Sequence, residues 1–358
     1  MVSARLRAAV AGPLLLALLL ALALALALAL ALGCGCAKAA PKGQAATQPT
    51  HPAPAPPSQA APADNRPKSP ISGLPYDPDK AGPLVAVMVE NHRDARPQSG
   101  LIGADLVYEA LAEGGISRFM ALYYGNTPDV IGPVRSARPY YVLLAHEWDA
   151  IYAHAGGDPK DLEPIHQWGL ADADEINNAG EAFWRSKERK MPHNLYTSIA
   201  RLRDHTARVY SRRKFSPPAA RWEFVPWAEH PAAQLDIRYD ADYGVTYKFE
   251  DGTYHRYMNG QLHVNKETGK PLEVANVLVQ YASTRVAYPD GGLKMDLIGK
   301  GDALYLAGGR IIKGTWRKDD LASATRFLDE SGQPISLTAG QTWIQIVPSG
   351  TKVTYSGR

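Results

Sequence analysis

The polar side chains that could do chemistry are densest between residues 105 and 119, where two glutamates stand four residues apart. Glu109 and Glu113 could each donate a proton to a leaving oxygen. On an extended strand they share a face roughly 13 Å apart, which is too far for a retaining carboxylate pair and long for an inverting one. On a helix they would be close enough to perturb each other. The valine and tyrosine content and Gly114-Gly115 favour the strand, which leaves a single-acid mechanism open.

Two arginines, Arg135 and Arg138, stand three residues apart at the start of a helix predicted over residues 136–148. Guanidinium groups beside free helix N–H groups suit a carboxylate, such as that of a lactyl or peptide group. The alternative is structural, because an arginine at a helix N-terminus opposes the helix dipole and requires an acidic neighbour. Glu109 or Glu113 could be that neighbour. Taken alone, the residue types favour structural ion pairs over catalysis.

His154 ends a short predicted strand and is followed by Gly156-Gly157 and a helix. A loop after the carboxyl end of a strand often binds ligands, so His154 could be an acid–base group or a substrate contact, although a lone histidine is more often structural. The segment 191–194, Met-Pro-His-Asn, could add a histidine and an asparagine to the same cleft. The residues expected to bind substrate are Asp105, Arg118, Arg135, Arg138 and His154.

Several kinds of site are missing from the sequence. We find no His-Glu-x-x-His, P-loop, Gly-x-Ser-x-Gly elbow, calcium loop or dinucleotide fingerprint, and the other histidines lack metal-ligand spacing. The two cysteines cannot build a four-thiolate zinc site. We therefore expect no metal and no cofactor.

The net charge of +3 reflects the N-terminal residues. Six of the 39 Lys and Arg but only one of the 36 acids lie in residues 1–73, which leaves 33 basic and 35 acidic residues, a formal charge of −2, in residues 74–358. The rest of the chain lacks the net positive charge expected of a phosphate-binding domain. We expect no nucleic-acid partner.

The first 36 residues have the pattern of an export signal: Arg5 and Arg7, an Ala/Leu run over residues 14–32, and small residues after it. Ala31-Leu32-Gly33-Cys34 resembles a bacterial lipobox, in which the cysteine carries lipid, although an uncleaved membrane anchor is also long enough. Cys36 is a second possible acceptor. Residues 37–73 contain nine Pro and ten Ala and are predicted to be a disordered linker. Both anchoring hypotheses place the folded part at the extracytoplasmic face of the cell membrane.

The remaining residues predict an α+β or α/β fold in two domains. Residues 74–215 alternate strands at 84–89, 106–111, 119–124 and 151–153 with helices at 136–148, 158–168 and 197–210, and form a mixed α/β domain. Beyond a proline-rich connector, residues 216–358 read as short strands separated by turns such as Asn259-Gly260, the pattern of a mostly antiparallel β domain.

Several motifs resemble the YerB-type lipoproteins of Gram-positive bacteria, a family with paired N- and C-terminal domains of unknown function. They are residues 95–101, 104–109, 113–119, 132–140 and 154–157 in the first domain and residues 314–316 and 340–344 in the second. Asp158 stands where the family pattern has serine. The resemblance covers nearly all of residues 74–350 and implies a lipid-anchored envelope protein, but it brings no established reaction.

The combined hypothesis is an exported lipoprotein that binds peptidoglycan glycan and cleaves it by a lytic transglycosylase or glycosidase reaction, with Glu109 or Glu113 as the acid. The 18 Tyr and seven Trp fit sugar stacking but are equally ordinary core residues. The alternative is a non-enzymatic module that scaffolds an envelope protein or captures a ligand.

Overall fold

The computed structural model describes residues 64–227 and 234–357. The predicted signal, lipobox and most of the predicted linker lie outside these residues. Within the described part, the chain forms one compact unit. None of its helices has both the length and the apolar character that a membrane span requires.

The N-terminal half combines strands with three α-helices and short 3-10 turns. Its strands are β1 (Val85–Glu90), β2 (Leu106–Leu111), β3 (Ser117–Tyr123), β4 (Ile151–His154), β5 (Ala171–Asp174), β6 (Phe183–Arg185) and β7 (Leu195–Thr197). Its helices are α2 (Pro139–Glu147), α3 (Pro159–Gln167) and α4 (Ile199–Val209), and its 3-10 turns are η1 (Pro78–Lys80), η2 (Arg93–Ala95), η3 (Leu101–Gly103), η4 (Glu113–Gly115) and η5 (Gly180–Ala182).

The C-terminal half contains strands only, within the residues described. These are β8 (Glu223–Phe224), β9 (Gln234–Arg238), β10 (Gly244–Glu250), β11 (Thr253–Met258), β12 (Gln261–Leu262), β13 (Glu273–Val274), β14 (Asn276–Ala282) and β15 (Thr284–Val286), followed by β16 (Leu293–Met295), β17 (Gly299–Ala307), β18 (Arg310–Lys318), β19 (Arg326–Asp329), β20 (Ser336–Leu337), β21 (Thr342–Pro348) and β22 (Lys352–Ser356).

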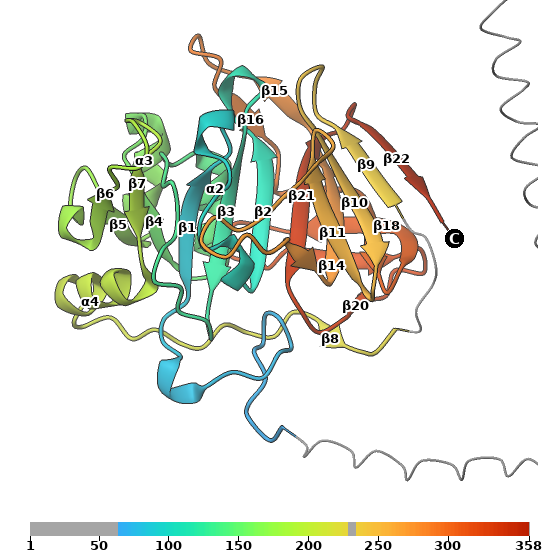
Figure 1. The fold of residues 1–358 in the computed structure, drawn as a ribbon, viewed down its shortest axis with the longest axis horizontal. Coiled ribbons are helices and arrows are strands. Elements are labelled where there is room, and N and C mark those ends of the chain that lie inside the picture. The colour runs from blue at the N-terminus through green and yellow to red at the C-terminus, as the bar shows by residue number, and fades with distance from the viewer. Residues whose placement is uncertain (1–63, 228–233, 358) are drawn as a thin grey trace, which may run out of the picture. The chain divides into compact units, whose positions relative to one another are not determined.

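A ten-stranded sheet in the order β19-β18-β17-β14-β21-β2-β3-β1-β4-β5 runs through both halves (Figure 1). The halves meet where β21 pairs in parallel with β2, so that Glu109 lies opposite Gln345. β4 pairs in parallel with both β1 and β5, whereas β3 pairs antiparallel with both β1 and β2. A second sheet contains β12-β11-β10-β9-β22, with β13 also paired to β11. The mixed N-terminal sheet and the mainly antiparallel C-terminal region confirm the predicted fold class.

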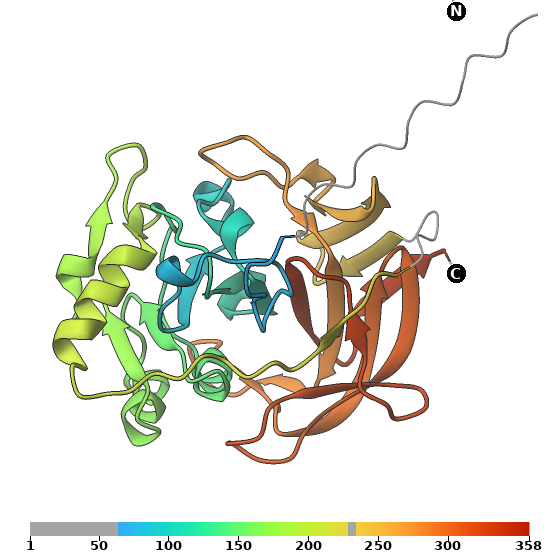
Figure 2. The same ribbon diagram turned by 90° about the horizontal axis from the view of Figure 1, so that it is seen from below.

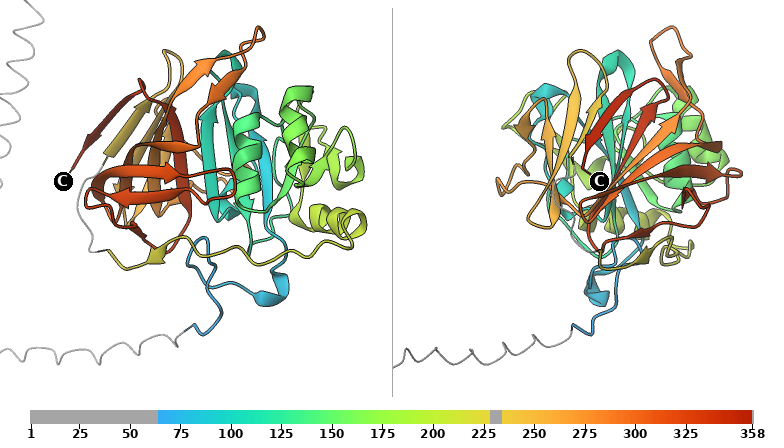
Figure 3. Two further views of the ribbon diagram at one scale, coloured as in Figure 1. Left: turned by 180° about the vertical axis from the view of Figure 1, so that it is seen from behind. Right: turned by 90° about the vertical axis from the view of Figure 1, so that its right-hand side faces the viewer.

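Alternation along the strands divides the core into two layers, because successive side chains of a strand point to opposite faces. Leu106, Tyr108 and Ala110 of β2 pack on one face with residues of α2 and α3, and Figure 3 shows these helices from behind, over the strands. Val107 lies in the other layer, with residues of β9, β10 and α4. Glu109 shares the face of Val107 and therefore points toward the second sheet.

Several sequence predictions are confirmed within a few residues, including β1, β2, β3, α2, α3 and α4. Asp158 caps α3 as expected, since its side chain accepts the Lys160 N–H. The short strands β5, β6, β7, β19 and β22 were not predicted. They contain only three to five residues each, which is too short for a clear alternation.

The connector between the halves follows α4 and crosses to the β-rich half (Figure 2). Part of it is β8, which pairs in parallel with β20. The predicted boundary at residues 215 and 216 falls in this connector. Because the ten-stranded sheet continues on both sides of it, the two halves share a core.

The folded unit begins earlier than the sequence predicts. Residues 64–73 were assigned to the disordered linker, but Ile71 is fully buried, and Ser69 and Ser72 donate hydrogen bonds to the buried carboxylate of Asp105. Ile71 is the one strongly apolar side chain of that segment. Its burial, together with two hydroxyl donors for Asp105, ties the segment to the core.

We predict that Ile71→Ala lowers the free energy of unfolding by about 2–5 kcal/mol, because it removes a fully buried side chain and leaves a cavity. Ile176→Ala is the matched control, since Ile176 is 68% exposed and its loss should change stability by less than about 0.5 kcal/mol. Urea unfolding of both variants measures the difference. Equal stabilities would contradict the inclusion of residues 69–73 in the core.

Candidate functional site

Glu109 is fully buried between the two sheets and holds an ion pair with Arg256 of β11. Its Oε2 accepts from Arg256 Nη2 at 2.6 Å. Its Oε1 accepts from the hydroxyls of Ser117 (2.6 Å) and Tyr243 (2.5 Å). Both oxygens of this predicted acid are therefore occupied by donors from β3 and the C-terminal half.

Arg256 is itself fully buried. Burial alone would lower its pKa, but the adjacent Glu109 charge holds the pKa well above its ordinary value. Its guanidinium lies 4.5 Å from the ring centre of Trp343 and donates from Nε to the Tyr247 hydroxyl. The Tyr247 hydroxyl also accepts from Gln345, the β21 residue beside Glu109.

The same network extends toward the surface through His263. Burial and the neighbouring Arg256 hold the pKa of His263 well below its ordinary value, so the ring is neutral. Its Nδ1 accepts from Arg256 Nη1, and its Nε2 consequently donates to Gln98 Oε1. Gln98 donates to Asn91 Oδ1, and Asn91 Nδ2 donates to Ser117 and Tyr243. The buried polar groups therefore form a closed ring of hydrogen bonds around the ion pair.

Glu113 lies apart from Glu109's network, in the turn η4. It forms an ion pair with Arg138, whose Nη2 is 2.7 Å from Oε2, and approaches Arg118 at 3.5 Å. Burial opposes the charged form, but the two arginines outweigh it and the pKa of Glu113 is lowered. Glu113 is therefore the acidic neighbour that an arginine at the start of α2 requires.

Arg135 pairs with neither predicted glutamate. Its Nη2 lies 2.8 Å from Glu90 Oε1, at the end of β1. His193, from the predicted Met-Pro-His-Asn segment, faces the same carboxylate with Nδ1 3.0 Å from each oxygen. His92 stacks on His193, and one ligand atom each from Glu90, His92 and His193 lies within 4.8 Å of the others.

His154 and Asp105 are both buried and bonded within the core. The two ring nitrogens of His154 lie 2.9 Å from Gly156 O and from Asp172 Oδ1. Asp105 accepts from the Tyr124 N–H as well as from two serines. These contacts leave neither side chain facing a cavity.

The largest hollow we find at the junction of the halves is a cavity of about 590 Å³. A second cavity of about 340 Å³ shares Arg93 and Arg96 with it, and we call the two together the interface groove. None of the predicted site residues lines it. Its lining residues include Asn91, His92, Arg93, Arg96, Gly114, Gly115, Ile116 and Ser117 from the first half and Asp240, Asp242, Tyr243, Asn259, Gln261, Leu262 and His263 from the second.

Arg96 connects this groove to the buried network. Its Nε and Nη2 donate to Asn91, and its guanidinium lies 5.2 Å from the ring centre of Tyr243. Among the described residues Nη1 has no hydrogen-bond partner, and Arg96 lines the groove. Arg93 has a side chain that is 86% exposed. The groove thus presents two cationic groups, one of them held in a fixed position.

Gly115 allows the first half to approach the second at the edge of this groove. Its φ is +73°, and an added Cβ would lie 2.4 Å from Asp240 Oδ2. A larger residue would therefore be strained and would clash with the carboxylate. Gly115 of the Gly114-Gly115 pair therefore permits the close contact between the two halves.

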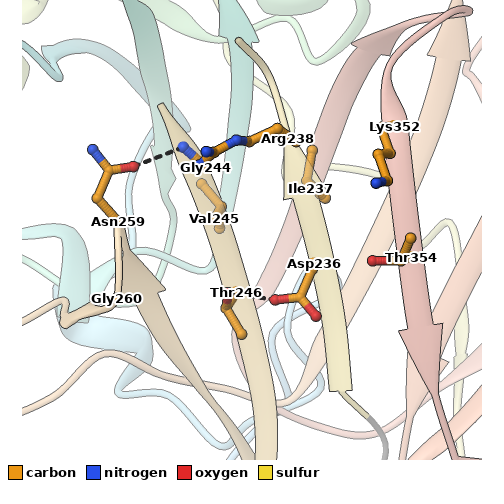
Figure 4. A pocket seen from close by; sticks show the side chains of 10 residues that line it. All are labelled: Asp236, Ile237, Arg238, Gly244, Val245, Thr246, Asn259, Gly260, Lys352 and Thr354. Atoms are coloured by element: carbon orange, nitrogen blue, oxygen red, sulfur yellow. Dashed lines mark hydrogen bonds between the residues drawn. The ribbon is translucent and has the colours of Figure 1, made fainter. Parts of the chain in front are cut away.

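A further cavity, of about 310 Å³, lies on the outer side of the second sheet (Figure 4). Two pairs of its polar groups bond one another: Thr246 donates to Asp236 at 2.6 Å, and the Gly244 N–H donates to Asn259 at 2.8 Å. Arg238 and Lys352 also line this cavity.

The residues that sequence reasoning missed come mainly from the second half and from the end of β1. Arg256 could have been predicted from the sequence as a buried charge, because it stands two residues from both Tyr254 and Met258 and so shares their buried face of β11. An arginine in a buried register requires an acidic partner. Which acid it meets depends on the packing of the two sheets.

We predict that Glu109→Gln lowers the free energy of unfolding by about 3–5 kcal/mol, because it leaves the Arg256 charge buried without its partner. Glu113→Gln should cost less, since Glu113 and its arginines are in part exposed to solvent. The double variant Glu109→Leu, Arg256→Met should regain much of the loss. Urea unfolding measures all three, and a Glu109→Gln loss no larger than that of Glu113→Gln would contradict the assignment.

Comparison with known proteins identifies the family. Residues 71–212 match the N-terminal domain, and residues 235–344 the C-terminal domain, of a family described as "Protein of unknown function (DUF3048)". "Putative lipoprotein YerB" of Bacillus subtilis is 32% identical over 292 residues, which cover 78% of this chain and 86% of that protein. The crystal structure of B. subtilis YerB matches with a TM-score of 0.73 and 31% identity, over 81% of this chain and all of that one. The chain therefore belongs to the YerB-type family, with an N-terminal and a C-terminal DUF3048 domain.

Proposed function

We propose that this protein is a cell-envelope lipoprotein that binds peptidoglycan without cleaving it, through the interface groove. The observation that carries the proposal is Arg96, which lines the groove and whose guanidinium is held by Asn91 and Tyr243, with no hydrogen-bond partner at Nη1 among the described residues. An arginine fixed in this way is suited to bind a carboxylate. Peptidoglycan carries such carboxylates on its stem peptides, and on lactyl groups only where the peptide has been removed.

The groove offers more than a positive charge. Arg93 adds an exposed cation, whose Nε lies 3.7 Å from Asp94 Oδ1, while Asn259 and the carboxylates of Asp240 and Asp242 supply polar groups from the second half. Asp240 already accepts two backbone N–H groups, so it is less available than Asp242. A ligand that combines carboxylates with amides and hydroxyls fits this lining better than a purely anionic polymer, because both signs of charge are present.

Binding is favoured over cleavage because neither predicted acid is suited to donate a proton. Glu109 is enclosed by three donors. Glu113 has a lowered pKa, whereas a general acid at neutral pH requires a raised one. The acid-catalysed hypothesis for Glu109 and Glu113 stays a prediction, which the release of muropeptides tests.

Anchoring at the extracytoplasmic face of the membrane through Cys34 is part of the proposal. Two observations support it: the Ala31-Leu32-Gly33-Cys34 motif and the name of the B. subtilis relative. The proline- and alanine-rich residues that follow would let the folded unit reach the wall from the membrane.

We expect the full chain, purified in detergent, to co-sediment with purified sacculi, and Arg96→Gln to weaken this binding about tenfold, because one charge-assisted hydrogen bond is lost. Arg93→Gln should weaken it without affecting the fold, since that side chain is exposed. Arg212→Gln, an exposed arginine outside the groove, is the control.

Equal sedimentation of the wild type and both groove variants would refute the groove as the wall site. The same incubation should release no muropeptides. Release by the wild type that is lost in Glu113→Gln or Glu109→Gln would instead establish cleavage.

We also predict that Cys34→Ser abolishes incorporation of a labelled fatty acid into the chain in cells, while Cys36→Ser leaves it unchanged. Cys34 directly follows the lipobox-like residues, whereas Cys36 has a poorer upstream context. Loss of label in Cys36→Ser alone would show that Cys36 carries the lipid. Loss of label in neither variant would favour an uncleaved anchor.

A further inference from the structure

We infer that Glu90, His92 and His193 form a binding site for a divalent transition metal of the zinc class. The inference does not depend on the proposed function, and it reverses the sequence-based expectation that no metal is bound. Two imidazoles with one carboxylate are a ligand set that proteins use for zinc sites with an open position. The three residues offer one ligand atom each within 4.8 Å of one another.

The fold explains why these three side chains meet. Glu90 is the last residue of β1, and the chain remains extended at His92 (φ −60°, ψ 147°). Residues two apart on an extended chain point to the same side. His193 comes from the loop that precedes β7 and is more than 100 residues away in sequence, so sequence spacing alone could not place it in a ligand set with Glu90.

The Glu90 carboxylate is a prepared ligand. It is only 4% exposed, and Arg135 Nη2 holds Oε1 at 2.8 Å, which leaves Oε2 for a metal. Ligating carboxylates are commonly fixed by such an outer hydrogen bond. His193 Nδ1 lies 3.0 Å from both carboxylate oxygens, so a metal would replace the proton that the ring shares with Glu90.

His92 supplies the third ligand after a small movement. Its ring stacks on that of His193. The ligand atoms of the three residues lie within 4.8 Å of one another, whereas those around tetrahedral zinc stand roughly 3.4 Å apart. The His92 side chain is 29% exposed and can turn. His92 Nδ1 accepts the Asp94 N–H at 3.3 Å, so the ring proton is on Nε2. A metal bound at Nε2 would shift that proton to Nδ1, where Asp94 Oδ2, 3.6 Å away, could accept it in a carboxylate–histidine–metal arrangement.

His92 connects the proposed metal site to the interface groove. His92 lines the 590 Å³ cavity, whereas Glu90 is buried behind it. A metal held by three protein ligands would keep its open position toward the groove. A water molecule or a ligand oxygen in the groove could complete the coordination.

The test is titration of the full chain, in detergent, with Co²⁺, whose visible d–d absorption reports tetrahedral or five-coordinate binding. We expect one Co²⁺ per chain, displaced by Zn²⁺, without the intense near-ultraviolet band of a thiolate ligand, which separates this site from Cys34 and Cys36. His193→Gln should weaken binding at least about tenfold while its amide still donates to Glu90. His92→Gln, at a partly exposed position, should weaken it similarly.

His166→Gln is the control, since His166 is exposed and outside the cluster. Circular dichroism establishes that each variant is folded. Absence of Co²⁺ absorption in the wild type, or equal affinity of the wild type and folded His193→Gln and His92→Gln chains, would overturn the site and leave Glu90, His193 and Arg135 as a structural ion-pair cluster.

Discussion

The buried ion pair between Glu109 and Arg256 is the contact on which the arrangement of the two halves depends. A charge removed from water is tolerated only when a partner and further hydrogen bonds compensate it. Each member of this pair lies on a different sheet, so neither half can be packed differently without leaving a bare charge. Ser117, Tyr243 and His263 satisfy the remaining positions, and the surrounding aromatic rings exclude water from them.

The interface groove follows from the same constraint. Its floor is the outer end of the buried network, because Asn91, Ser117 and Tyr243 both line the groove and bond to one another. Arg96 is held in position by hydrogen bonds to the buried Asn91. A binding group supported in this way loses little conformational freedom when a ligand arrives. Glu109, which the sequence predicts to be a catalytic acid, accepts hydrogen bonds from Ser117 and Tyr243 and so positions two residues that line the groove.

Local patterns were sufficient for many of the elements that place these residues. The apolar run of β1, the alternation in β2 and the Asp158 cap of α3 are each encoded within a few neighbouring residues. Short edge strands such as β5 and β19 were missed, because their order comes from pairing with a neighbour. Ile71 and Ser72 were assigned to the linker, because the surrounding Pro- and Ala-rich composition predicts disorder. The burial of Ile71 and the hydrogen bond of Ser72 to Asp105 are tertiary contacts that composition does not indicate.

The sequence by itself determined the family and the fold class, and it predicted that an arginine at the start of the first helix needs an acidic neighbour, with Glu109 and Glu113 as the candidates. These depend on local pattern or on short separations along the chain. Tertiary structure alone decided that Glu109 meets Arg256, that Arg135 and His193 converge on Glu90, and that a groove opens beside Arg96. Those contacts join residues 45 to 147 positions apart in the sequence. The packing of the two sheets and their loops brings these residues together, and a local sequence pattern carries no information about that packing.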